Sequence, residues 1–231
     1  MKTIGLLGGM SWESSLEYYR LLNQMVRQRL GRMHSARCIL YSLDFAEIED
    51  LQMRSDWDRS ADILIAAAQG LERAGADGLL ICTNTMHKLA DQVGANISIP
   101  LLHIADGTAH AIQDQGLQTI GLLGTRFTME EAFYRGRLED QYNLRVLIPN
   151  ADDRQVVHDV IYNELVQGVS NPASRQVYLE IIGRLVEQGT QGIILGCTEI
   201  GLLVKPEHTA IPLFDTTLIH AQVAVDWALG E

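Results

Sequence analysis

The sequence has little of what several large classes of protein require. Its 18 Lys and Arg residues stand against 29 Asp and Glu, a formal net charge of −11, and no Lys- or Arg-rich run occurs. Surfaces that bind nucleic acid need clustered positive charge, so a nucleic-acid partner is not expected. No apolar stretch approaches the roughly 18 residues of a membrane-spanning helix, so no membrane association is expected either.

Cysteine is scarce as well, with three widely spaced residues, Cys38, Cys82 and Cys197. Such an odd, dispersed set argues against a disulfide framework, and a reducing cytoplasm is the expected location. No CxxC or HExxH motif occurs, so no metal site is expected. The opening residues carry one Lys and a short apolar run broken by Gly, unlike a signal peptide. Their GLLGGMS segment lacks the G-x-G-x-x-G spacing, so no nucleotide cofactor is expected.

What the sequence does contain is an internal repeat. Three pairs of similar segments follow one another in the same order, beginning at Thr3 and Thr119, at Leu71 and Leu185, and at Ile99 and Ile211. The offsets within these pairs are 116, 114 and 112 residues. We therefore expect two similar lobes, residues 1–115 and 116–231, with the C-terminal helix free to pack back on the first.

Each half alternates short apolar runs with helical segments. TIGLLG and DGLLIC are continuous apolar runs, typical of strands buried on both faces. This alternation predicts an α/β fold of two pseudosymmetric lobes, each a mainly parallel sheet flanked by helices. Ligands of open parallel sheets bind beyond the carboxyl ends of the strands, so the active site is expected in a cleft between the lobes.

Helix boundaries are expected from capping residues. Ser60 is a candidate N-cap, and Gly75 and Gly189 are candidate residues just beyond helix ends. Thr128 and Glu131 have the spacing of a capping box. In the first long helix, apolar residues recur at spacings of three and four, at Leu16, Tyr19, Leu22, Val26 and Leu30.

The repeat also aligns the polar residues that end the central strands. Pairing Gly78 with Gly192 pairs Thr83 with Cys197, and it leaves Cys82 one residue out of register. Side chains alternate along a strand, so Cys82 should point away from the face that Thr83 lines. For Cys82 a structural role is favoured, whereas Cys197 is the better candidate for chemistry.

Two groups on opposite faces of one carbon can remove a proton from one side and deliver one from the other. A thiolate suits this task when its pKa of about 8.5 is lowered by its surroundings. Backbone N–H groups, together with the side chains of Asn84, Thr85 and Thr198, could hold a substrate carboxylate as charge moves into it.

The segments GLLGGMSWESS, CTNTMHK, IPLLHIAD, GTRFTM and GCTEIGLLV together resemble the aspartate/glutamate racemase family, most closely its enterobacterial amino-acid racemases. The resemblance extends throughout the chain. It implies an isomerase that binds a small amino acid, needs no pyridoxal phosphate or other cofactor, and is a homodimer.

Members of that family usually carry one catalytic Cys per lobe, in C-N-T-x-H and G-C-T-E motifs. Cys197 matches the second motif, whereas Thr83 stands at the usual Cys position of the first. In the family, the thiol of the second half takes the proton from the L-enantiomer. The resemblance therefore implies an L-selective enzyme with Cys197 as base and Thr83, or a water that it holds, on the opposite face.

The resemblance also implies which residues contact the substrate: Met10, Gln52, Asn84, Thr85, Thr198 and Glu199. Glu199 would anchor the ammonium group or hold Thr198. Gln52, rather than Arg54, aligns with the position near the substrate side chain, which weakens the case for a strictly aspartate-specific pocket. L-Glutamate and L-aspartate are the first choice of substrate, and a broader amino-acid range is the second.

Other readings remain open. Related scaffolds host hydantoin racemases and decarboxylases of malonates, and loss of one thiol would also suit a non-catalytic amino-acid sensor. His87 either tunes the site or caps the following helix. His103 and Asp215, at matching positions after the third repeated strand, either orient neighbouring groups or satisfy the backbone.

Overall fold

The computed structural model describes residues 1–31 and 33–230. The chain forms two compact units, one comprising Met1–Ile104 and His220–Glu231, the other Ala105–Ile219. The sequence placed the boundary at residue 115, but helix α5 (Ile104–Asp114) lies almost entirely in the second unit. Most of the C-terminal helix α11 (Thr216–Leu229) belongs to the first unit.

The first unit is built on a parallel sheet with strand order β2-β1-β3. Its strands are β1 (Ile4–Gly8), β2 (Cys38–Ser42) and β3 (Gly78–Ile81). A parallel bridge between Leu79 and Leu101 continues this order beyond β3. The remaining elements of the unit are α1 (Trp12–Leu30), α2 (Phe45–Met53), α3 (Trp57–Arg73), η1 (Thr85–Leu89) and α4 (Ala90–Gly94).

The second unit is built on a parallel sheet with strand order β5-β4-β6-β7. Its strands are β4 (Thr119–Gly124), β5 (Arg145–Leu147), β6 (Gly192–Gly196) and β7 (Leu213–Asp215). Its other elements, besides α5, are α6 (Arg126–Glu130), α7 (Ala132–Tyr142), α8 (Ala151–Asn163), η2 (Leu165–Gln167), α9 (Pro172–Glu187), α10 (Ile200–Leu203) and η3 (Pro206–His208).

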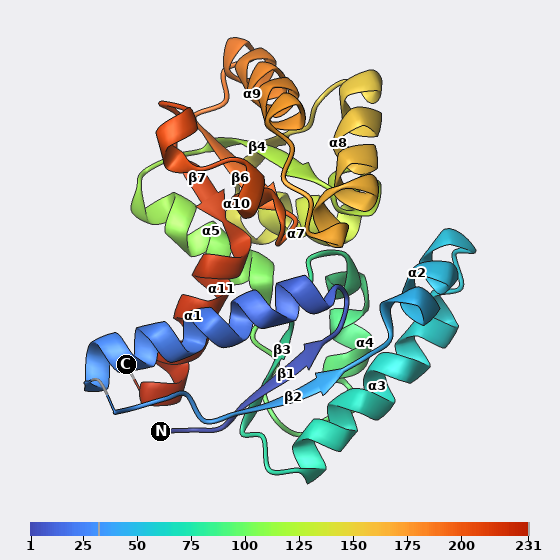
Figure 1. Ribbon diagram of the computed structural model, residues 1–231, viewed down its shortest axis with the longest axis vertical. Helices are drawn as coiled ribbons and strands as arrows, with labels where there is room; N and C mark the ends of the chain where they lie inside the picture. Colours follow the sequence, from blue (N-terminus) through green and yellow to red (C-terminus); the bar gives the residue numbers. More distant parts are fainter. Residues whose placement is uncertain (32, 231) are drawn as a thin grey trace. The chain divides into compact units, whose positions relative to one another are not determined.

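The two sheets share one topology, in which the first strand of each unit lies between the second and the third. Figure 1 shows this order in the first unit, where β1 lies between β2 and β3. This confirms the predicted α/β fold with two parallel sheets flanked by helices. The repeat in the sequence thus corresponds to a repeat of strand order. It follows that residues aligned by the repeat occupy equivalent places in the two sheets.

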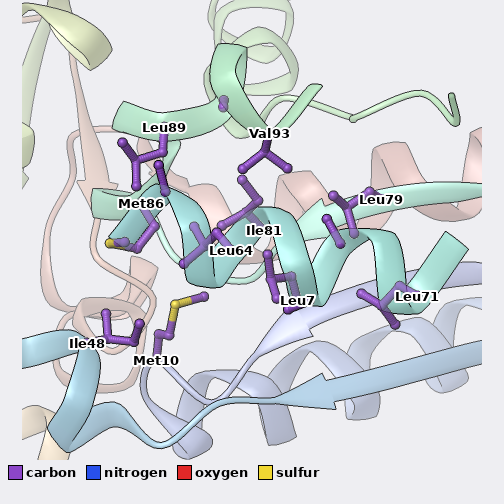
Figure 2. Close-up of a cluster of buried hydrophobic side chains, with 14 of the residues drawn as sticks. Leu7, Met10, Ile48, Leu64, Leu71, Leu79, Ile81, Met86, Leu89 and Val93 are labelled. Carbon is purple, nitrogen blue, oxygen red and sulfur yellow. The ribbon is translucent and has the colours of Figure 1, made fainter. Parts of the chain in front are cut away.

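Alternation along β3 distributes its side chains between two cores. Leu79 and Ile81 pack with α3 and α4, in the cluster that Figure 2 shows around Leu64. Leu80 and Cys82 face the other way and pack with apolar residues of α1 and α11. Both faces of the strand are therefore buried, as its continuous apolar sequence predicts.

The buried stripe of α1 agrees with the predicted one at Leu22 and Val26 and differs at the other three positions. Leu16, Tyr19 and Leu30 are 55%, 51% and 43% exposed. The helix packs onto the sheet through the predicted Leu22 and Val26, together with Tyr18, Leu21 and Met25, which the sequence did not predict. Two overlapping apolar stripes satisfy the helical period, and contact with the sheet and α11 decides between them.

Two predicted caps are wrong, while both predicted glycine ends are confirmed. Helix α3 begins one turn earlier than expected, with Asp56 as N-cap, and the hydroxyl of Ser60 donates to the Asp56 carbonyl from inside the helix. Thr128 lies inside α6, which Thr125 caps. Gly75 and Gly189 follow helix ends with φ of 95° and 94°, the left-handed region that suits glycine.

Within the described residues, no helix is both long and apolar enough to cross a membrane.

Candidate active site

The carboxyl ends of β3 and β6 have the same burial profile. In each, five buried residues, 78–82 and 192–196, lead to one partly exposed residue, which is Thr83 or Cys197. Three buried residues follow in both cases. The position that emerges from each core is therefore the one that the repeat alignment selects, and equivalent strand ends present a hydroxyl in the first unit and a thiol in the second.

Cys197 is hydrogen-bonded to the residues that follow it. Its Sγ lies 3.0 Å from Oε2 of Glu199, and the hydroxyl of Thr198 donates to the same oxygen at 2.5 Å. Glu199 and Thr198 are only 3% and 6% exposed. Since a carboxylate oxygen accepts and cannot donate, the thiol carries the proton in this arrangement.

The surroundings of Cys197 raise its pKa well above the ordinary value, first through burial and then through the negative charge and hydrogen bond of Glu199. Hydrogen bonds from the backbone near Glu199 and Thr198 act in the opposite direction but are smaller. The sequence argument called for surroundings that lower the thiol pKa. Here a buried carboxylate stabilises the protonated thiol instead.

Glycines allow the strands to approach closely beside Cys197. Gly124 pairs with Gly196 in the sheet register, and a Cβ on Gly124 would lie 2.8 Å from the Gly196 carbonyl oxygen. A Cβ on Gly196 would lie 2.8 Å from the Leu123 carbonyl oxygen. The backbone that carries Cys197 is thus confined by contacts that leave no room for a side chain.

The turn that carries Thr83 is held by side chains. The hydroxyl of Ser14 donates to the Cys82 carbonyl at 2.8 Å, and Nδ1 of His87 lies 2.8 Å from the Thr83 carbonyl oxygen. Cys82 itself is fully buried, and burial raises its thiol pKa. These properties agree with a structural role for Cys82.

Asn84 and Thr85 follow directly and are 2% and 5% exposed. The Asn84 carbonyl accepts the N–H of His87 at 3.1 Å, which opens the short helix η1. Both side chains are therefore buried at the strand end, immediately after Thr83.

Gln52 and Met10 lie in the same part of the first unit. Gln52, on α2, is 3% exposed, and its Nε2 lies 2.9 Å from Sδ of Met86. Met10, from the turn after β1, belongs to the same apolar cluster as Met86, and Figure 2 shows Met10 next to Ile48. Arg54 is exposed and forms an ion pair with Asp50 of α2. Of these two residues, Gln52 is therefore the one whose side chain is buried within the first unit.

The predicted site residues thus divide between the two units. The first unit carries Met10, Gln52, Thr83, Asn84 and Thr85, and the second carries Cys197, Thr198 and Glu199. Among the described residues, no group of three or more His, Cys, Asp or Glu side chains is arranged to hold a metal ion.

Sequence reasoning missed Ser14 and His220. Ser14 holds the Cys82 carbonyl, and His220 bonds to Tyr18 and to the Leu102 carbonyl. Ser14 resembles an ordinary residue of a helix first turn, and His220 lies far along the chain from its partners. Neither carries a sequence signal that could have revealed these contacts.

Comparison with known proteins identifies the family. The family model described as Asp/Glu/Hydantoin racemase matches residues 7–224. The chain belongs to this racemase family. The motifs that predicted the family are therefore confirmed, and the chain is an isomerase of the racemase type.

Two solved structures of the family are similar over the whole chain. A putative Asp/Glu racemase from Yersinia pestis is 53% identical, with a TM-score of 0.92 over 99% of this chain and 100% of that one. PH1733, an aspartate racemase homologue from Pyrococcus horikoshii OT3, is 33% identical, with a TM-score of 0.87 over 99% and 100%. The broad specificity amino-acid racemase RacX of Bacillus subtilis (strain 168) is 24% identical over 98% of both chains.

Proposed function

We propose that this racemase inverts the α-carbon of amino acids without pyridoxal phosphate and favours L-glutamate and L-aspartate. Cys197 is the base for the L-enantiomer, and Thr83, or a water that it holds, acts on the opposite face. The observation that carries the proposal is the hydrogen bond between Cys197 and the buried carboxylate of Glu199, at the repeat position that Thr83 occupies in the first unit.

Glu199 supplies the acceptor that the protonated thiol of Cys197 needs. The thiol passes its proton to Oε2 of Glu199 and, as thiolate, takes the α-proton of the L-substrate. The ammonium group of the substrate favours this step, because its positive charge lowers the pKa of a nearby thiol. The electron pair left on the α-carbon moves into the substrate carboxylate.

Thr83 completes the inversion by delivering a proton to the opposite face, directly or through a water. A solvent proton then restores the Thr83 hydroxyl, and Glu199 releases the proton it took from the thiol to solvent. A hydroxyl is a much weaker acid than a thiol and, unassisted, a poor base, so removing the α-proton of a D-substrate is slow. The equilibrium constant between enantiomers remains one. Unequal kcat values in the two directions are therefore matched by unequal KM values.

The turn at Thr83 also supports a carboxylate site. Its neighbouring carbonyls, those of Cys82 and Thr83, accept hydrogen bonds from Ser14 and His87. In a trans peptide the N–H points away from the C=O, so the N–H groups of Thr83 and Asn84 are directed away from these partners. Backbone N–H groups of this kind stabilise negative charge that develops on a substrate carboxylate.

A broad-specificity racemase is the second candidate. The similarity to RacX over 98% of both chains favours it. So does α2, where the buried side chain is the uncharged Gln52, whereas Arg54 is exposed and paired with Asp50. An uncharged amide places a weaker demand on the substrate side chain than a buried guanidinium would.

The test is α-proton exchange in D₂O, followed by NMR with L-Glu, D-Glu, L-Asp and D-Asp incubated separately. We expect rapid exchange of the L-substrates and slow exchange of the D-substrates. Cys197→Ala should reduce L-exchange by at least about 10²-fold, the usual contribution of a general base. Cys38→Ala, which removes a thiol elsewhere in the first unit, is the matched control and should exchange like the parent.

Other outcomes would redirect or overturn the proposal. Equally fast α-proton exchange of the L- and D-enantiomers contradicts the roles given to Cys197 and Thr83. Comparable exchange of several neutral amino acids identifies the broad-specificity candidate. No exchange with any amino acid, or loss of CO₂ from an arylmalonate instead, overturns the racemase proposal.

A further inference from the structure

We infer that His87 is a positioning residue for Thr83, whose backbone it holds through one tautomer of a buried imidazole. The inference rests on the proposed function, because it concerns the proton that Thr83 delivers. The ring is 3% exposed and bonds on both sides to main-chain atoms of its own unit.

The hydrogen bonds determine which nitrogen of His87 carries the proton. The N–H of Ile104 points to Nε2 at 3.2 Å, and a backbone N–H can only donate. Nε2 is therefore an acceptor, and Nδ1 carries the hydrogen. Nδ1–H then donates to the Thr83 carbonyl oxygen at 2.8 Å.

Two hydrogen bonds together fix the direction of the Thr83 side chain. The peptide plane before Thr83 contains the Cys82 carbonyl, which Ser14 holds at 2.8 Å. The plane after it contains the Thr83 carbonyl, which His87 holds. When both planes around a Cα atom are fixed, its φ and ψ are fixed, and so is the direction of its Cα–Cβ bond.

The second half of the repeat has no equivalent of this ring. At the 114-residue offset His87 corresponds to Gly201, where a Cβ would lie only 2.3 Å from Oδ2 of Asp215. Asp215, which corresponds to His103, accepts the N–H groups that begin α11. In the second half, the Sγ of Cys197 is instead hydrogen-bonded to the carboxylate of Glu199. The imidazole thus serves only the half that carries the hydroxyl.

Positioning matters more for Thr83 than for Cys197. A hydroxyl that passes a proton to a short-lived carbanion must already be aligned when the charge forms, and displacement by about 1 Å can cost 10²-fold in rate. The chain fixes the hydroxyl by fixing its backbone, because a threonine has one rotatable bond between Cα and its oxygen.

His220 provides a matched control. It is fully buried, its ring centroid lies 5.7 Å from that of His87, and its Nε2 lies 2.8 Å from the Leu102 carbonyl oxygen. The carbonyl accepts, so Nε2 donates, and Nδ1 accepts the hydroxyl of Tyr18 at 2.8 Å. His220 therefore anchors the same segment before α5, whereas it is His87 that contacts the Thr83 carbonyl.

The experiment separates the two bonds of His87. His87→Asn keeps an amide N–H near the place of Nδ1, whereas His87→Gln keeps an oxygen acceptor near the place of Nε2. With an L-substrate in D₂O, deuterium washed into the remaining L-enantiomer reports Cys197, and formation of the D-enantiomer reports Thr83 as well. The ratio of these two rates is the measured quantity.

We expect His87→Gln to lower D-enantiomer formation about tenfold more than it lowers deuterium wash-in, since misplacing a proton donor by a fraction of an ångström has effects of this order. His87→Asn should keep the parent ratio to within about twofold. His220→Ala should lower both rates by the same factor, as a purely structural defect would.

If an active His87→Gln protein keeps the parent ratio of D-enantiomer formation to deuterium wash-in, the role of His87 is overturned and the proposed function is left intact. Absence of α-proton exchange in the parent protein overturns the proposed function instead. Should the variants fail to fold, ¹⁵N NMR of the imidazole nitrogens in the parent protein tests the inference. The Nδ1–H tautomer of His87 is expected, and the Nε2–H tautomer would overturn the inference because it is incompatible with both bonds.

Discussion

The thiol of Cys197 donates a hydrogen bond of 3.0 Å to the carboxylate of Glu199, two residues further along the chain. Both groups lie at the end of β6, where Glu199 is 3% exposed. Burial and the negative charge of Glu199 raise the thiol pKa, so the pair holds one proton, on sulfur.

Glu199→Gln should lower the pKa of the Cys197 thiol, because it removes a neighbouring negative charge that disfavours the thiolate. The measurement is the rate of alkylation by iodoacetamide between pH 6 and 10, in a Cys38→Ser background. The pH at half-maximal rate should fall. Thr198→Val removes the other donor to Glu199 but keeps its charge, so the thiol pKa should remain high. An unchanged pH of half-maximal alkylation in Glu199→Gln would contradict the effect assigned to the Glu199 charge.

Stability should fall at alkaline pH because of Cys82. Burial raises the pKa of this thiol in the folded protein, whereas a thiol in the unfolded chain ionises near pH 8.5. Its contribution is fully present below about pH 8 and is lost as pH rises, by up to about 1.4 kcal/mol per pH unit. Urea unfolding from pH 7 to 10 should show a smaller alkaline loss in Cys82→Ala, which itself costs about 1 kcal/mol at pH 7. If the free energy of unfolding of the parent and of Cys82→Ala falls equally with rising pH, Cys82 is not the cause of the alkaline loss.

Gly201→Ala should destabilise the protein by about 1–3 kcal/mol, because the added methyl would lie 2.3 Å from Oδ2 of Asp215. Gly183→Ala is the control. Gly183 lies inside α9, where an added Cβ meets nothing within 4 Å, and alanine there should stabilise by about 0.5–1 kcal/mol. Urea midpoints measure both. Equal changes at the two positions would show that Asp215 moves aside freely.

Thr83→Cys should raise α-proton exchange on D-substrates by about tenfold or more, since a thiolate is a far better base than a hydroxyl. Thr83→Val has nearly the same shape without a proton to give, and it should slow formation of the D-enantiomer from L-substrate. Both are measured by NMR in D₂O. If Thr83→Val forms the D-enantiomer as fast as the parent, the hydroxyl is not the donor.

Local sequence predicted the elements better than their faces. Continuous apolar runs predicted the strands at β1 and β3, and Gly75 and Gly189 marked helix ends because left-handed backbone suits glycine. The buried face of α1 was predicted only in part, at Leu22 and Val26, since two overlapping apolar stripes fit this helix. Caps were misassigned at Ser60 and Thr128 because several nearby residues could cap.

By itself, the sequence determined the family, the parallel α/β architecture and the register that pairs Thr83 with Cys197. A repeat of fixed spacing carries that information, because equivalent residues occupy equivalent places in two sheets of one topology. Only the tertiary structure decided the state of the thiol and the partners of the histidines. Burial depends on how elements pack, and His220 meets Tyr18 across 202 residues of sequence, a contact to which no local pattern corresponds.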